Sequence, residues 1–167
     1  MSRIAMVPLD EMTDELRESV VRGLENRMLS SPRPIQVWAN RPPIAQAWLE
    51  LMGSFHRDSL LGERLRELLR LKVASITTCQ ACQLARKSEE VSEEDIACLS
   101  TDSEHFTPAE QAALRFAELF AGDYMAIDDS HYARLAEFFT QAQVVEINMY
   151  CALMLAGGRM TYVQQAY

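Results

Sequence analysis

Apolar side chains recur at helical spacing along most of the chain, whereas the strict alternation that is typical of strands is almost absent. The clearest stripe consists of six aliphatic residues placed three or four positions apart: Leu61, Leu65, Leu68, Leu69, Val73 and Ile76. Such a stripe indicates one buried face of a long helix. Because comparable stripes continue to the end of the chain, we expect an all-α fold.

Capping residues and helix breakers divide the chain into a series of predicted helices. Thr107, followed by Pro108 and by Glu110, is typical of a capping box with proline at the first helical position. The Pro-rich stretch 32–43 predicts an irregular link, and Gly157-Gly158 predicts the end of the last helix. The expected helices cover residues 13–29, 42–55, 61–76, 79–90, a short segment opening at 92, 107–122, 130–139 and 140–158.

A chain of 167 residues is long enough to bury a hydrophobic core. We therefore expect a single-domain multi-helix bundle. In this bundle residues 1–41, an N-terminal helix and the Pro-rich link, pack on a core formed by residues 42–167.

The charge balance argues against polyanionic partners. Sixteen Lys and Arg face 24 Asp and Glu, which gives a net charge of −8 and repels nucleic acid and anionic lipid. The basic residues Arg64, Arg66, Arg70 and Lys72 are interleaved with glutamates and are interpreted as a mixed, solvated face. The longest apolar run, Met149 to Ala156, is too short to cross a bilayer, and the first residues lack the pattern of a secretion signal. A cytoplasmic protein without a membrane partner is expected.

The candidate chemistry lies at Cys79 and Cys82, a C-x-x-C motif at the predicted start of a helix. At this spacing the two Cα atoms lie about 5–6 Å apart, which suits a disulfide. The free N–H groups and the positive dipole end of the first turn stabilise a thiolate. The motif therefore indicates redox chemistry.

Two other interpretations of the cysteine pair remain open. The pair could be half of a zinc site, although there is no second C-x-x-C and the histidines His56, His105 and His131 are scattered. It could also be two small core residues without chemistry. The other cysteines, Cys98 and Cys151, are flanked by apolar residues, which favours core packing. No phosphate-binding loop or metal motif is present in the sequence, so neither a cofactor nor a metal is expected.

Two charged residues, Glu67 and Arg86, are candidates for a role in the chemistry of the thiols. If the chain folds back antiparallel after Thr77-Thr78, Arg86 comes within about one helical turn of the level of Glu67. Arg86 also follows Cys82 by four positions. Glu67, Arg86 and the thiol could then form a line, in which Arg86 binds Glu67 as a bidentate partner. The alternative is an exposed Glu–Arg pair of little energetic weight.

The segment LGERLRELLRLKVASITTCQACQLARKSEEVSEEDIACLS resembles the core of the carboxymuconolactone decarboxylase superfamily, on its alkylhydroperoxidase D-like side. The resemblance extends through FTPAEQAALRFAEL and QAQVVEINMYCALMLAGGRM, over roughly residues 42–163. It implies an all-α fold and assembly into homo-trimers or hexamers. It also implies that Cys82 attacks a peroxide, that Cys79 resolves the sulfenic acid as a disulfide, and that Glu67 ends a proton relay.

The chain departs from the family pattern at two positions. Arg86 stands where the relay usually has histidine, and Ala81 lies where the peroxidase subgroup can carry histidine. Arginine does not accept a proton, so the usual relay is broken, but its permanent charge favours a thiolate at Cys82.

The expected function is therefore a thiol-dependent oxidoreductase that reduces hydroperoxides or exchanges disulfides, with a dithiol or protein reductant as its partner. A binding or assembly protein that kept the fold without the activity is the alternative. A lactone decarboxylase is a weaker one, because decarboxylases of the superfamily do not depend on such a cysteine pair.

Overall fold

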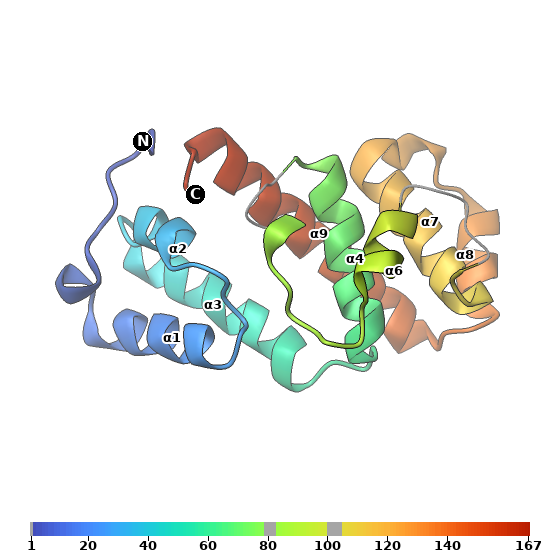
Figure 1. Ribbon diagram of the computed structural model, residues 1–167, viewed down its shortest axis with the longest axis horizontal. Helices are drawn as coiled ribbons and strands as arrows, with labels where there is room; N and C mark the ends of the chain where they lie inside the picture. Colours follow the sequence, from blue (N-terminus) through green and yellow to red (C-terminus); the bar gives the residue numbers. More distant parts are fainter. Residues whose placement is uncertain (1, 79–82, 100–104) are drawn as a thin grey trace. The chain divides into compact units, whose positions relative to one another are not determined.

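The computed structural model describes residues 2–78, 83–99 and 105–167, and these residues form helices and loops without a strand (Figure 1). The all-α fold predicted from the sequence is confirmed. The elements, in chain order, are η1 (Leu9–Glu11), α1 (Asp14–Glu25), α2 (Arg33–Trp38), α3 (Pro42–Arg57), α4 (Glu63–Ile76), α6 (Glu93–Cys98), α7 (Pro108–Gly122), η2 (Tyr124–Ala126), α8 (Asp129–Ala136) and α9 (Gln141–Gln164).

The chain forms two compact units. Unit 1 consists of Met1–Ser59 and Arg159–Tyr167, and unit 2 consists of Leu60–Gly158. The domain division expected from the sequence, 1–41 and 42–167, stays a prediction. Within the described residues, no helix is both long enough and apolar enough to cross a membrane.

Unit 1 has a hydrophobic core between α1, α2 and α3. Leu16 and Val20 of α1 are fully buried and belong to one cluster with Ile35 of α2 and Leu49 of α3. The indole of Trp38 donates a hydrogen bond to Oε1 of Gln164 at 2.8 Å, which ties α2 to the last turn of α9. Unit 1 is thus stabilised by apolar burial and by polar contacts between its segments.

Unit 2 is organised around α4, which packs on α7 (Figure 1). Leu68 and Leu71 of α4 share a core cluster with Leu114 of α7 and with Phe106, which lies just before α7. The face of α4 predicted from its leucine stripe is indeed buried. Since a buried helix is held on several sides, α4 is a rigid support for the residues that line it.

Several helix starts agree with their sequence signals. Thr107 and Glu110 form the expected capping box at α7, with Pro108 in the first turn. The Thr140 hydroxyl accepts from the Gln143 N–H, and the Gln143 side chain accepts in turn from the Thr140 N–H, which caps α9. These local hydrogen bonds satisfy N–H groups that a helix leaves without intrahelical partners.

Three boundaries differ from the prediction. The Pro-rich link contains a helix, α2, because proline is tolerated in the first turn. The last helix does not end at Gly157-Gly158 but continues to Gln164. A Cβ on Gly158 would lie 2.7 Å from the Thr77 Oγ1, so this glycine permits close packing and is no helix stop. The predicted helix 79–90 does not continue past Leu84, because the next residues bond to α4 instead.

Candidate functional site

The predicted cysteine pair follows the end of α4. Thr77 ends the helix, and Thr78 has a φ of 51°, in the left-handed region that β-branched residues rarely adopt. Cys79 and Cys82 themselves lie outside the described residues. The described chain resumes at Gln83, so the structure defines both edges of the motif.

After the cysteines the chain runs back along α4, as residues 83–90, which we call the return segment (Figure 1). Its contacts with α4 proceed toward the start of that helix, so the segment runs antiparallel to α4, which was the condition for bringing Arg86 near the level of Glu67. The hydrogen-bonded pairs are Gln83 with Ala74, Ala85 with Arg70, Lys87 with Glu67, and Glu90 with Arg64.

At the middle of this contact lies a buried ion pair between Glu67 and Arg70, whose residues are 3% and 4% exposed. Arg70 donates from Nε to Oε2 and from Nη2 to Oε1 of Glu67, both at 2.7 Å. The Arg70 Nη2 also donates to the Ala85 carbonyl at 2.8 Å, and Glu67 Oε1 accepts from the Lys87 N–H at 3.0 Å. The two charges neutralise each other, and both members hold the backbone of the return segment.

The buried phenol of Tyr150, on α9, lies in the electrostatic field of this pair. Burial raises the pKa of Tyr150 well above its ordinary value, Arg70 lowers it and Glu67 raises it. The phenol is therefore protonated throughout the physiological range of pH.

Arg86 does not bind Glu67, so the predicted bidentate Glu67–Arg86 contact is wrong. Its guanidinium pairs with Glu93 of α6, from Nε to Oε1 at 2.8 Å and from Nη2 to Oε2 at 3.1 Å. The Ala85 carbonyl and the Lys87 N–H both face α4, and Arg70 already occupies the carboxylate of Glu67. Hydrogen bonding to Glu93 raises the pKa of Arg86, and Glu67 adds to this at longer range. Arg86 thus carries a permanent charge, as expected.

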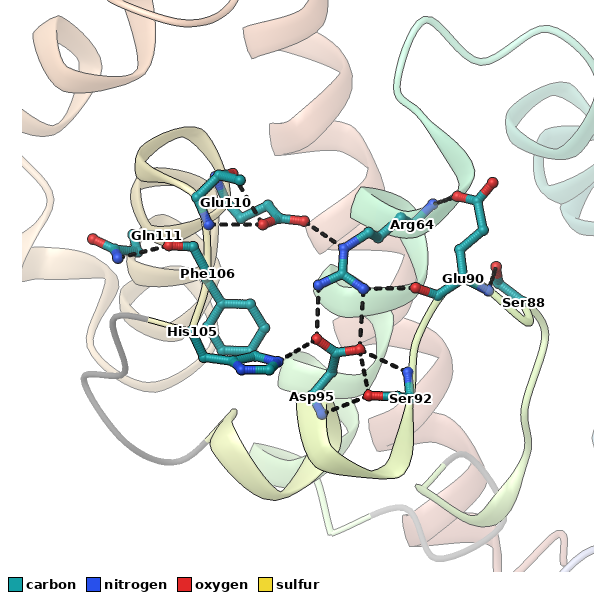
Figure 2. A network of polar contacts seen from close by, with 10 residues as sticks. Arg64, Ser88, Glu90, Ser92, Asp95, His105, Phe106, Glu110 and Gln111 are labelled. Atoms are coloured by element: carbon teal, nitrogen blue, oxygen red, sulfur yellow. Dashed lines mark hydrogen bonds and ion pairs between the residues drawn. The ribbon is translucent and has the colours of Figure 1, made fainter.

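The C-terminal end of the return segment, at Glu90, is held by Arg64, at the start of α4 (Figure 2). Its guanidinium donates to Asp95 of α6 from Nη1 at 3.0 Å and from Nη2 at 2.7 Å. It also donates to the Glu90 carbonyl at 2.6 Å and, from Nε, to Glu110 of α7 at 2.8 Å. One arginine therefore joins α4, α6, α7 and the return segment.

Asp95 is the buried counterpart of Arg64. It also accepts from the N–H and the hydroxyl of Ser92, and its Oδ1 lies 2.7 Å from the Nε2 of His105 (Figure 2). Hydrogen bonding to Arg64 holds the pKa of Asp95 far below its usual range, against the opposing effect of burial. Asp95 is accordingly ionised at neutral pH.

The mixed solvated face predicted around Arg64 is wrong for three of its members. Glu67, Arg70 and Lys72 are buried, and the Lys72 Nζ donates to the Leu99 carbonyl at 2.8 Å. Sequence reasoning missed Arg70 and Asp95 as site residues. The available signal was the spacing Arg64-x-x-Glu67-x-x-Arg70, which places all three on one side of a helix.

The remaining cysteines agree with core packing. Cys151 is fully buried, and burial raises the pKa of its thiol to about 12. Cys98 is partly buried and packs against the core of unit 2. Among the residues that the structure describes, no group of three His, Cys, Asp or Glu side chains is arranged to hold a metal ion.

Comparison with known proteins identifies the fold. The model of the carboxymuconolactone decarboxylase family matches residues 42–119, a range that includes Glu67, both cysteines of the motif and Arg86. A sequence comparison with curated proteins finds no significant match.

Solved structures share nearly the whole architecture. One is an uncharacterized peroxidase-related protein from Ralstonia eutropha JMP134 with an alkylhydroperoxidase AhpD core, at 18% identity and a TM-score of 0.80, covering 99% of this chain and 91% of that one. Another is a cysteine-to-alanine variant of the debrominase Bmp8 in complex with 2,3,4-tribromopyrrole, at 20% identity and a TM-score of 0.80, covering 100% and 91%. Apo Bmp8 matches with a TM-score of 0.77 at 20% identity, covering 100% and 92%. Residues 42–119 thus resemble the carboxymuconolactone decarboxylase family, and the chain has the fold of the AhpD-like structures.

Proposed function

We propose that this chain is a thiol-dependent oxidoreductase in which Cys82 attacks and Cys79 resolves. The main support for this proposal is that the family match covers the C-x-x-C motif together with Glu67 and the start of the return segment. Support also comes from the two edges of the motif, since Thr78 turns the chain at one edge and Gln83 bonds to α4 at the other.

The reaction needs only the two thiols and a hydroperoxide. The Cys82 thiolate attacks the O–O bond, which breaks; the sulfur becomes a sulfenic acid, and the alkoxide leaves as an alcohol after taking up a proton. The Cys79 thiol then displaces water from the sulfenic acid and forms the Cys79–Cys82 disulfide. A dithiol or a protein thiol supplies the two electrons that reduce this disulfide. With a disulfide as oxidant, the first step is a mixed disulfide and the leaving group is a thiolate.

Arg86 stabilises the thiolate in this proposal and does not act as a base. It follows Cys82 closely in the sequence and carries a charge that cannot be titrated in the physiological range. Its ion pair with Glu93 fixes the guanidinium at the surface, where its side chain is 34% exposed. We further propose that the protein is cytoplasmic and works as a homo-trimer or hexamer.

The test is peroxide turnover with dithiothreitol as reductant. Cys82→Ser should abolish turnover, because no sulfenic acid can form. Without the reductant, Cys79→Ser should undergo one oxidation and accumulate a sulfenic acid that dimedone traps. Cys98→Ser is the matched control, since it removes a thiol that packs against the core, and its turnover should equal that of the wild type. Equal turnover by wild type and Cys82→Ser would remove Cys82 from the mechanism.

Two further assays separate the alternatives. Alkylation of Cys79 and Cys82 as a function of pH tests the thiolate; a binding protein without activity would show thiols no more reactive than a model thiol at pH 6–7. A substrate panel with a muconolactone and 2,3,4-tribromopyrrole tests other reactions, the latter because Bmp8 was crystallised with it. Lactone conversion by the Cys79→Ser/Cys82→Ser variant would favour decarboxylation.

A further inference from the structure

We infer that Glu67 and Arg70 are positioning residues, a buried clamp that fixes the backbone following Cys82, and that Glu67 does not carry protons. The inference rests on the proposed function for its effect on turnover, but the clamp itself can be tested without any activity.

The geometry of the clamp is reciprocal. Arg70 Nη2 bonds to both Glu67 Oε1 and the Ala85 carbonyl, while Glu67 Oε1 accepts from both Arg70 and the Lys87 N–H. The two backbone groups on either side of Arg86 are thus bound by opposite members of one ion pair. A backbone carbonyl and an N–H that leave helical structure need such partners when water is scarce.

Burial gives this arrangement its strength. Both side chains are almost fully buried, at 3% for Glu67 and 4% for Arg70, so removing one charge would leave the other without its ion-pair partner in a buried site. The forked guanidinium also fixes the orientation of the carboxylate, because two parallel hydrogen bonds allow only one plane. The position of Lys87, and of the chain leading back to Cys82, is therefore set by α4.

The same contacts argue against proton transfer through Glu67. Among the residues that the structure describes, its hydrogen bonds come from the Arg70 guanidinium, which supplies two, and from the Lys87 backbone N–H. Neither group gives up a proton at physiological pH. The carboxylate is thus occupied by donors that orient it toward Arg70 and the return segment.

Two double variants separate a clamp from a relay. Glu67→Gln/Arg70→Met keeps an oxygen that accepts from the Lys87 N–H, and Glu67→Ala/Arg70→Met removes it. Neither leaves an unpaired buried charge, so both should fold, and neither has a titratable group at position 67. A proton relay predicts equal turnover and the same pH profile for both, whereas a clamp predicts higher turnover for the variant with glutamine.

We expect the glutamine variant to turn over peroxide at least about tenfold faster than the alanine variant, because the two differ only in the group that accepts from the Lys87 N–H. Backbone hydrogen exchange, followed by NMR, is the readout that needs no activity: the Lys87 amide should exchange about tenfold faster in the alanine variant than in the glutamine variant. The Ala113 amide, buried in α7, is the reference, since faster exchange there would report general destabilisation. Arg17→Met breaks an exposed ion pair with Asp14 on α1 and should change neither quantity.

The outcomes are distinct. Equal exchange of the Lys87 amide in the two double variants would overturn the clamp, whatever the turnover. Equal and low turnover in both, with the Lys87 amide still protected by glutamine, would restore Glu67 as a proton carrier. If the wild type turns over no peroxide, the proposed function fails, while slower Lys87 exchange in the glutamine variant still supports the clamp.

Discussion

Replacement of Asp95 by asparagine tests the polar network that anchors the return segment. The substitution keeps the shape of the side chain but removes the charge that faces Arg64 and leaves one carbonyl oxygen where two carboxylate oxygens accepted. Asp95 accepts two charge-assisted hydrogen bonds from Arg64, one contact from His105 and two from Ser92. An NH2 group in place of one oxygen brings two donors together at that point.

The expected cost is about 2–4 kcal/mol of unfolding free energy. A hydrogen bond to a charged group contributes about 1.5–3 kcal/mol, and removal of one partner of a buried pair costs about 3–5 kcal/mol. The lower range applies because Arg64 is partly exposed and keeps Glu110 and the Glu90 carbonyl as partners.

The cost depends on pH in a defined direction. The pKa of Asp95 is lower in the folded chain than in the unfolded chain, so its contribution is complete above the unfolded value and is lost as the pH falls below it. The contribution of the Asp95 charge should be fully present at pH 7. With an unfolded pKa of about 3.9, it should shrink by about 1.3 kcal/mol at pH 3.

Urea unfolding followed by circular dichroism measures this difference. Trp38 and Trp48 both lie in unit 1, so tryptophan fluorescence reports separately on that unit. Glu93→Gln is the matched control, because it removes an exposed carboxylate of the same short helix and should not move the midpoint measurably. A cost below about 0.5 kcal/mol at pH 7, or a difference that does not shrink toward pH 3, would refute the reasoning.

Two further results are expected. Gly158→Ala should destabilise the protein by about 1–3 kcal/mol in the same urea assay, because the new Cβ would lie 2.7 Å from the Thr77 Oγ1. Gly122→Ala is the control: a Cβ there would have nothing within 4 Å, so this variant should be neutral or stabilised by up to about 1 kcal/mol. Equal effects of the two substitutions would contradict the close packing of α9 on Thr77. Cys151 should resist iodoacetamide at pH 8 until the chain is denatured, because its buried thiol has a pKa of about 12, and mass spectrometry would detect any premature labelling.

The helices were predictable where local signals determine them. The leucine stripe of α4 and the capping box at Thr107 need only neighbouring residues, so both could be recognised in the sequence. Residues 85–90 look helical by the same criteria. Their conformation is decided instead by Arg70 and Glu67, which lie at least fifteen positions away in the sequence. Tertiary hydrogen bonds of this kind outweigh local propensity.

The candidate site was predictable in its residues and not in its pairing. Glu67 and Arg86 were singled out by their distance from the cysteines, on the condition that the chain returns antiparallel to the preceding helix. Two carboxylates, Glu67 and Glu93, compete for two guanidinium groups, and only the three-dimensional structure shows that Arg70 binds the buried one. The sequence contains the charges but not their burial, and burial decides which pair is formed.

At Ala85 and Lys87 the return segment contacts α4 through main-chain atoms, whereas α4 contributes the side chains of Arg70 and Glu67. These two hydrogen bonds therefore do not restrict the residue types at positions 85 and 87, since any amino acid but proline at 87 supplies the same atoms. The helix has no such freedom. Distant homologues with the same arrangement should retain the triplet Arg64, Glu67 and Arg70, even where the sequence of the return segment is no longer similar.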